Sequence, residues 1–317
     1  MRKIDLIKNP ELFQGEYYLD KFKNYFEGWY FKNTNGYDNI AFIPGISINN
    51  DKKSAFIQVI TNNSSYYVDY DIDDFEFNDV PFYIRIKNNY FSCDNIHIDI
   101  NDSKNNLIIK GDIGYYDSEN ISTSKYSPNI MGPFSYVPFM ECNHAVISMR
   151  NRTNGEININ GIDINFDGGI GYIEKDYGVS FPSKYIWCQG NNFDDSDASF
   201  MMSIANIPFK IFRFRGLICS LIVDGCEYRF ATYNNAKVVK FIVNDGLLDI
   251  GLKKGDYDLR IMTKYDDGFK LMAPVNGEMN KDIVESITAD VKVRLKKKKK
   301  VIFSSVSRNC GLEIVSD

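Results

Sequence analysis

The segment Gly171–Phe193 reads GYIEKDYGVSFPSKYIWCQGNNF and is the most informative stretch of the chain. Side chains of a β-strand point alternately to its two faces. In a strand, Tyr172, Glu174 and Asp176 would therefore share one face, while Lys175 would point to the other. The segment predicts a strand that carries two carboxylates side by side.

The rest of the chain continues the same period of two. Apolar residues alternate with polar ones in Ile96–Ile100 and Val291–Leu295. Tight-turn pairs separate such runs, as at Asn35-Gly36, Asn154-Gly155 and Asp224-Gly225. The 23 Phe, 21 Tyr and 2 Trp make 15% of the residues, an excess that favours strands. The pattern predicts an all-β fold of antiparallel sheets or barrels.

The length of 317 residues predicts two packed units. A boundary near Asp167 gives an N-terminal barrel over 1–166 and a C-terminal barrel over 167–317, each long enough for about eight strands. The longest irregular stretch, Asp117–Pro138, is typical of a lid or a binding loop.

Charge and composition exclude several classes of function. A net charge of −5 gives no reason to expect a nucleic-acid partner. We find no apolar run typical of a signal peptide or a membrane span, so a soluble, cytoplasmic protein is expected. Six cysteines without a CxxC pair and only two histidines, His97 and His144, predict no metal site and no disulfide framework. The sequence leaves the oligomeric state open.

Three blocks stand out: Phe26–Lys32 (FEGWYFK), Gly132–Met149 (GPFSYVPFMECNHAVISM) and Gly171–Phe193. The first resembles the opening motif of the tocopherol cyclase family, and the third resembles the family's internal motif. In the third block, the positions that match the family's internal motif are Tyr172, Glu174-Lys175, Gly178, Phe181-Pro182, Lys184, Trp187 and Gln189, followed by Asn191 and Phe193. The chain departs from the plant enzymes at Asp176-Tyr177, where those tend to carry Asn-Trp.

The resemblance implies a fold of two lipocalin-like, or calycin-like, antiparallel β-barrels in tandem, shared with the more distant acyclic carotenoid hydratases. It also implies a cyclase of the isomerase or lyase type, or a hydratase, that protonates an alkene of a prenylated quinol or another prenyl lipid. Neither reaction requires a metal or a redox cofactor. The alternative is a non-catalytic lipocalin-like carrier of a hydrophobic small molecule, which keeps the fold without the chemistry.

The proton donor is predicted from the two carboxylates. Glu174 and Asp176 would lie about 6.5 Å apart along the strand. At an effective dielectric constant of about 20, their repulsion is roughly 2.5 kcal/mol, close to two pKa units. Burial acts in the same direction, so one carboxyl group would stay protonated near neutral pH. We expect Glu174 to be the acid and Asp176 to raise its pKa.

Other residues are assigned to the same site. The aromatic rings of Tyr172, Trp29 and Trp187 would stabilise a carbocation. Glu141, Asn143 and His144 would orient the substrate or relay a proton, although Asn143 and His144 can face the same way only across a bulge. Further residues expected to bind substrate are Lys175, Gln189 and Asn191. A pocket near the junction of the two barrels would be formed by the second and third blocks.

Plainer interpretations stay open for each feature. Glu174–Asp176 could be a solvated charged turn, and Trp29, Trp187 and His144 could be core residues. The run Lys296, Lys297, Lys298, Lys299 and Lys300 is interpreted as a hairpin turn that protects a sheet edge, or as a patch that contacts anionic membranes.

Overall fold

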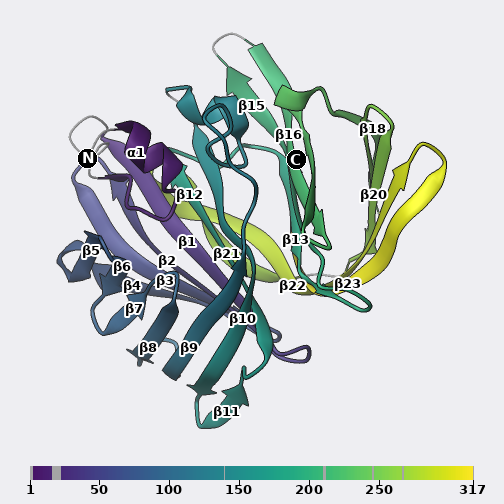
Figure 1. Cartoon of the computed structure of the whole chain (residues 1–317). Coiled ribbons are helices and arrows are strands. Elements are labelled where there is room, and N and C mark those ends of the chain that lie inside the picture. The colour runs from purple at the N-terminus through teal and green to yellow at the C-terminus, as the bar shows by residue number, and fades with distance from the viewer. Residues whose placement is uncertain are drawn as a thin grey trace. The chain divides into compact units, whose positions relative to one another are not determined.

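The structure of the chain is a computed structural model. It describes residues 3–15, 23–138, 140–209, 212–244, 246–265 and 268–316, and most of these residues lie in β-strands. The chain divides into two compact units. The first consists of Met1–Asn120, Met140–Phe181 and Leu271–Asp282, and the second of Ile121–Phe139, Pro182–Lys270 and Ile283–Asp317. Both large sheets are antiparallel (Figure 1), so the all-β prediction is confirmed.

Among the described residues, the first sheet has 12 strands in the order β4-β3-β2-β1-β12-β10-β9-β8-β7-β6-β5, with β11 paired to β10. The bounds are β1 Asn24–Thr34, β2 Asn39–Asn49, β3 Lys52–Thr61, β4 Ser65–Asp71, β5 Phe75–Asp79, β6 Phe82–Ile86, β7 Asn89–Phe91, β8 Asn95–Asp102, β9 Leu107–Glu119, β10 Cys142–Ile159, β11 Ile162–Asn165 and β12 Gly169–Gly178. Helix α1 spans Lys3–Lys8, and a 3₁₀ turn, η1, spans Ile72–Asp74.

The first sheet curves around one apolar core. Trp29 on β1 stacks on Phe82 of β6, six places away in the strand order, at 6.4 Å between ring centroids. Ile57 on β3 and Ile98 on β8 belong to the same buried cluster as Trp29. Residues from distant strands can share a core only if the sheet bends, so this face of the sheet is concave. The chain's own aromatic and aliphatic side chains pack there.

The second sheet has 11 strands among the described residues, in the order β17-β16-β15-β13-β23-β22-β20-β19-β18, with β14 paired to β23 and β21 to β22. The bounds are β13 Tyr185–Gly190, β14 Asn192–Phe193, β15 Ser199–Phe209, β16 Phe212–Val223, β17 Cys226–Ala231, β18 Lys237–Asn244, β19 Leu247–Lys254, β20 Tyr257–Lys264, β21 Phe269–Val275, β22 Glu278–Lys297 and β23 Lys300–Val315. Two 3₁₀ turns are η2 Gly132–Tyr136 and η3 Thr232–Asn234. Its core contains Cys188, Phe200, Leu221, Ile250 and Val293.

The prediction of two closed barrels is not confirmed. In the described ranges, no pairing joins β4 to β5 in the first sheet or β17 to β18 in the second. Closure depends on which strands meet at the two ends of a sheet, and alternation within a strand does not specify that. The boundary predicted at residue 167 also differs from the observed units. Strand β12 pairs with β1 and β10, so Met140–Phe181 belongs to the first unit, whereas Ile121–Phe139 belongs to the second.

The predicted turns give mixed results. Asp224-Gly225 forms the two-residue turn between β16 and β17, with φ of 51° and 71°. Asn154-Gly155 was wrong as a turn, because β10 continues through it opposite β9. Gly155 adopts φ of 128°, and a Cβ there would lie 2.1 Å from the carbonyl oxygen of Asp112. A close approach of two backbones, and not a chain reversal, therefore requires this glycine.

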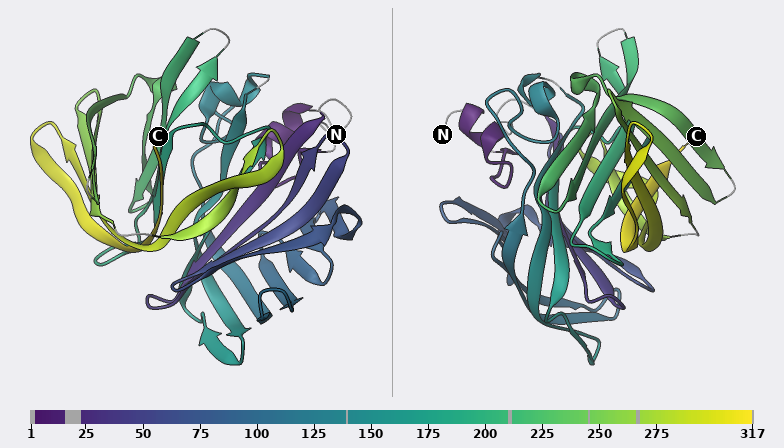
Figure 2. Two further views of the ribbon diagram at one scale, coloured as in Figure 1. Left: turned by 180° about the vertical axis from the view of Figure 1, so that it is seen from behind. Right: turned by 45° about the vertical axis from the view of Figure 1, so that its right-hand side comes forward.

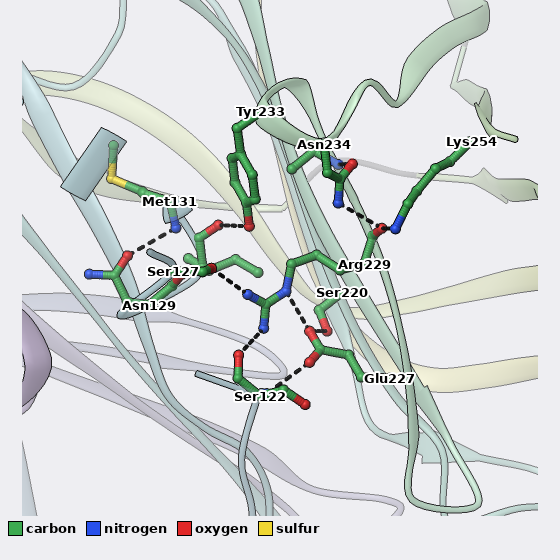
Figure 3. Close-up of polar contacts among 12 residues, drawn as sticks. Ser122, Ser127, Asn129, Met131, Ser220, Glu227, Arg229, Tyr233, Asn234 and Lys254 are labelled. Atoms are coloured by element: carbon green, nitrogen blue, oxygen red, sulfur yellow. Dashed lines mark hydrogen bonds and ion pairs between the residues drawn. The ribbon is translucent and has the colours of Figure 1, made fainter. Parts of the chain in front are cut away.

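The irregular segment after β9 is tied to the second sheet by Arg229 (Figure 3). The guanidinium donates to the Ser122 carbonyl oxygen at 2.6 Å and to Ser127 Oγ at 2.9 Å. It also contacts Glu227 at 2.6 Å, and Glu227 accepts a hydrogen bond from the Ser122 backbone N–H at 2.8 Å. The Tyr233 hydroxyl adds a bond to the Ile130 carbonyl oxygen at 3.0 Å. These contacts connect the segment to β17 and η3 of the second unit.

No helix within the described ranges is long and apolar enough to cross a membrane.

Candidate active site

The candidate site lies on two neighbouring strands of the first sheet. The register of β10 and β12 places His144 opposite Asp176 and Val146 opposite Glu174. On the other side of β12, Tyr30 of β1 lies opposite Glu174. Side chains directly across a sheet point to the same face. The polar groups of the second and third sequence blocks therefore meet here, on the face that points away from the core of the first unit.

The side chains form a connected chain of polar contacts. Asp176 Oδ1 lies 3.0 Å from His144 Nδ1, and His144 Nε2 lies 3.3 Å from Glu174 Oε2. The Tyr172 hydroxyl donates to that same glutamate oxygen at 2.6 Å. The thiol of Cys142 lies 3.6 Å from Asp176 Oδ1. His144 thus stands between the two carboxylates and can take a proton on one nitrogen while it gives up a proton from the other.

Exposure falls along this chain. The exposed fraction of the side chain is 22% for Asp176, 13% for His144 and 6% for Glu174. Burial, together with the neighbouring Glu174 carboxylate, raises the pKa of the Tyr172 hydroxyl well above its usual value. Burial likewise raises the pKa of the Cys142 thiol. Burial therefore favours the neutral, protonated forms of Tyr172 and Cys142.

The alternative of a metal centre fits this arrangement less well. The donor atoms of His144, Glu174 and Asp176 lie within 4.8 Å of one another. However, the two carboxylates face different nitrogens of the imidazole, and these nitrogens point away from each other. One cation could reach all three residues only if His144 turned away from one carboxylate. In the observed geometry, each carboxylate lies at its own nitrogen of the imidazole.

The register between β10 and β12 shows which of Asn143 and His144 shares a face with the carboxylates. His144 faces Glu174 and Asp176, whereas Asn143 lies opposite Tyr177, a residue of the core. The register of β10 with β12 is regular from Cys142 to Val146, so the Asn143 side chain points to the opposite face from His144. Glu141 precedes β10, and its backbone carbonyl accepts bonds from the N–H groups of residues 179 and 180, which closes the end of β12.

Lys175 and Trp29 lie on the opposite face of the sheet from Glu174. Lys175 is fully buried, and its Nζ contacts Glu27 Oε1 at 2.8 Å and the Leu12 carbonyl oxygen at 2.5 Å. The ammonium also lies 5.2 Å from the centroid of the Trp29 ring, a cation–π contact. The Trp29 Nε1–H donates to the carbonyl of Glu11 at 2.8 Å. Both side chains are therefore buried in the core of the first unit. For Trp29, this agrees with the interpretation as a core residue.

Glu27 completes this buried ion pair and was not identified from the sequence. Its carboxylate accepts bonds from the backbone N–H groups of Gln14 at 2.9 Å and Gly15 at 3.0 Å, and from the Tyr25 hydroxyl at 2.7 Å. The pair therefore fastens the segment that follows α1 onto β1. Tyr30 was missed as well. The FEGWYFK block contains it, but only the register with β12 shows that Tyr30, and not Trp29, faces Glu174.

The remaining predicted residues belong to the second unit. Trp187 and Gln189 lie on β13, with their side chains on the face opposite to Cys188 of the core. The Gln189 side chain is fully buried, and neither atom of its amide has a hydrogen-bond partner among the described residues. Asn191, just after β13, is also buried. An unpartnered buried amide is costly, which makes Gln189 a candidate for binding a ligand.

Comparison with known proteins supports the resemblance seen in the sequence. The sequence profile described as tocopherol cyclase-like matches residues 109–316, about two thirds of the chain. The chain belongs to the tocopherol cyclase-like family. The match covers β10 and β12, and so includes Cys142, His144, Tyr172, Glu174 and Asp176. No curated protein sequence matches this tocopherol cyclase-like chain.

Solved structures share its fold at low sequence identity. A putative AttH from Nitrosomonas europaea matches with a TM-score of 0.53 and 12% identity over 93% of both chains. CghA, solved with Sch210972, matches with a TM-score of 0.57 and 8% identity over 93% of this chain and 89% of its own. Kievitone hydratase from Nectria haematococca gives 0.54 and 12% over the same shares. These likenesses establish the fold of the tocopherol cyclase-like chain.

Proposed function

We propose that this tocopherol cyclase-like protein catalyses the cyclisation or hydration of a hydrophobic alkene, with Glu174 as the acid that protonates the double bond. The observation that carries the proposal is the polar chain Asp176–His144–Glu174–Tyr172 on one face of β10 and β12. The substrate class is a prenylated quinol or another prenyl lipid, as the family implies.

The relay has a direction set by exposure. Asp176 is the most exposed member and holds the Nδ1 side of the imidazole, while the almost fully buried Glu174 lies at the Nε2 side. His144 passes a proton from the Asp176 side to Glu174 after each turnover. Sequence reasoning gave Asp176 the task of raising the Glu174 pKa by direct repulsion. With the imidazole between them, its main task is to orient His144 and to stabilise the protonated ring.

The chemical step balances without a cofactor. The π electrons of the alkene take the proton of the Glu174 carboxyl group, which leaves a tertiary carbocation and a carboxylate. In cyclisation, a hydroxyl oxygen of the substrate attacks the cation and loses its proton to the Asp176 side of the relay, and His144 then returns a proton to the Glu174 carboxylate. In hydration, a water molecule does the same. Tyr172, hydrogen-bonded to Glu174, and Tyr30, 6.4 Å from Tyr172 between ring centroids, provide aromatic faces that stabilise the cation.

The comparisons support this class of reaction. The family name refers to a cyclase, and one protein of the same fold is by name a hydratase. The carrier alternative places a ligand inside each barrel-like unit. In each unit the core is packed with the chain's own apolar residues, such as Phe31 and Phe91 in the first and Phe200 and Phe230 in the second. We therefore favour catalysis on the polar face.

The test is a reaction run in D₂O with a prenylated quinol as probe and mass spectrometry as the readout. The wild type should form a product that carries one carbon-bound deuterium. Replacing Glu174 by Gln removes the acid and should lower the rate at least 100-fold. The matched control is Glu156→Gln, an exposed glutamate of β10, which should keep the wild-type rate.

Two outcomes would overturn the proposal. Full activity of E174Q would show that Glu174 is not the acid. If prenyl lipids that co-purify with the wild type are returned unchanged, with no deuterium, the carrier function would hold instead.

A further inference from the structure

The lysine run of the sequence forms the tip of the β22–β23 hairpin. Lys297 pairs with Lys300, and Lys298 and Lys299 form the two-residue turn between them. The six residues Lys297–Ile302 are all exposed. Figures 1 and 2 show this tip, coloured yellow, at the far end of its two strands. We call Lys296–Ile302 the lysine hairpin.

A bulge places two apolar residues on the surface beside the lysines. The register passes from Leu295 opposite Phe303 to Lys296 opposite Val301, so Ile302 is an extra residue in β23. In a regular strand, one of two consecutive residues would point to the core. Here Val301 is 46% and Ile302 39% exposed, whereas the next residue, Phe303, is buried. The hairpin therefore presents an apolar pair together with its positive charges.

The charge of the lysine hairpin is opposite to that of the protein. The chain carries a net charge of −5, so the residues outside these five lysines carry −10. Two acids lie beside the hairpin: Asp256, at the turn between β19 and β20, lies 4.0 Å from Lys298 Nζ, and Asp258 of β20 lies opposite Lys296. The lysines thus stay a concentrated cationic group on an acidic chain.

We propose that the lysine hairpin docks the protein on the surface of bilayers that contain anionic phospholipids. Lysines near such a surface are attracted by its negative potential, and an apolar pair beside them can enter the boundary between headgroups and acyl chains. Lysines alone would serve a nucleic acid or an acidic protein equally well. Val301 and Ile302 favour a lipid surface, because a bilayer offers a continuous apolar layer below its anionic groups, which a nucleic acid lacks and which the surface of an acidic protein offers only in patches. The inference is independent of the reaction proposed above.

Vesicle co-sedimentation tests the proposal with the full-length protein. The wild type should bind vesicles of phosphatidylcholine with 30% phosphatidylserine, and binding should weaken when the salt concentration is raised from 0.1 to 0.5 M. Each lysine near the surface strengthens binding by about fivefold, so K298Q/K299Q should weaken it about 25-fold. V301S/I302S should weaken it about tenfold.

Matched controls use exposed residues of the first unit. K87Q/K104Q removes two exposed lysines, and I108S/I162S removes two exposed isoleucines. Both control proteins should bind the vesicles like the wild type. The proposal is overturned if the wild type does not bind anionic vesicles, if V301S/I302S binds as well as the wild type, or if a 20-base-pair DNA duplex binds more tightly than the vesicles. Circular dichroism confirms that each variant is folded.

Discussion

Replacing Lys175 with methionine is expected to lower the free energy of unfolding by roughly 3–5 kcal/mol, because the change leaves a buried carboxylate without its counter-ion. Lys175 and Glu27 are fully buried, and their 2.8 Å ion pair sits between the Leu12 carbonyl and the Trp29 ring. Methionine keeps most of the packing of the lysine stem. The Glu27 carboxylate keeps its bonds from the backbone of Gln14 and Gly15 and from the Tyr25 hydroxyl, which favours the lower end of the range.

Urea denaturation, followed by tryptophan fluorescence, measures the effect. The double variant E27Q/K175M should be less destabilised than K175M by about 1–2 kcal/mol, since it removes the uncompensated charge. The control is Lys110→Met. Lys110 is exposed and lies 3.3 Å from Asp99, so its loss should cost less than about 0.5 kcal/mol. A K175M protein as stable as the wild type but defective in substrate binding would refute this reasoning and restore the binding role predicted from the sequence.

Three further changes probe other parts of the molecule. Tyr172→Phe removes the 2.6 Å bond to Glu174 and should slow deuterium incorporation about tenfold or more, with unchanged thermal unfolding; an unaffected rate would exclude the hydroxyl from the relay. Gln189→Met should raise the free energy of unfolding by about 1–2 kcal/mol, because its buried amide has no partner among the described residues; a loss of stability in urea would show that the amide is satisfied. Asp249, paired with Arg260 and Lys240, has its pKa lowered to about 2, so the ionised form stabilises the folded state by roughly 2 kcal/mol above pH 4. That stability should be lost as the pH falls through 2, so Asp249→Asn should be destabilised at pH 7 and should differ from the wild type by less than about 0.5 kcal/mol at pH 2 in thermal melts.

Local patterns in the sequence predicted the strands well. Alternation placed Tyr172, Glu174 and Asp176 on one face of a strand, and the register of β12 agrees. Turn chemistry predicted the reversal at Asp224-Gly225. The same chemistry was misleading at Asn154-Gly155, because a glycine at a close approach of two strands looks the same in sequence as a glycine in a turn.

The segment Gly171–Phe193 shows where sequence ends and tertiary structure begins. By itself, the sequence determined the family, the all-β class and the shared face of the two carboxylates, because these depend on residue type and on a period of two. Only the tertiary structure decided that His144 stands between the carboxylates, that Tyr30 joins them, and that Lys175 pairs with Glu27, 148 residues earlier. Those facts depend on strand register and pairing over long separations. A shift of one residue in the register of a strand moves every side chain to the other face of the sheet. No local sequence pattern specifies which strands will pair.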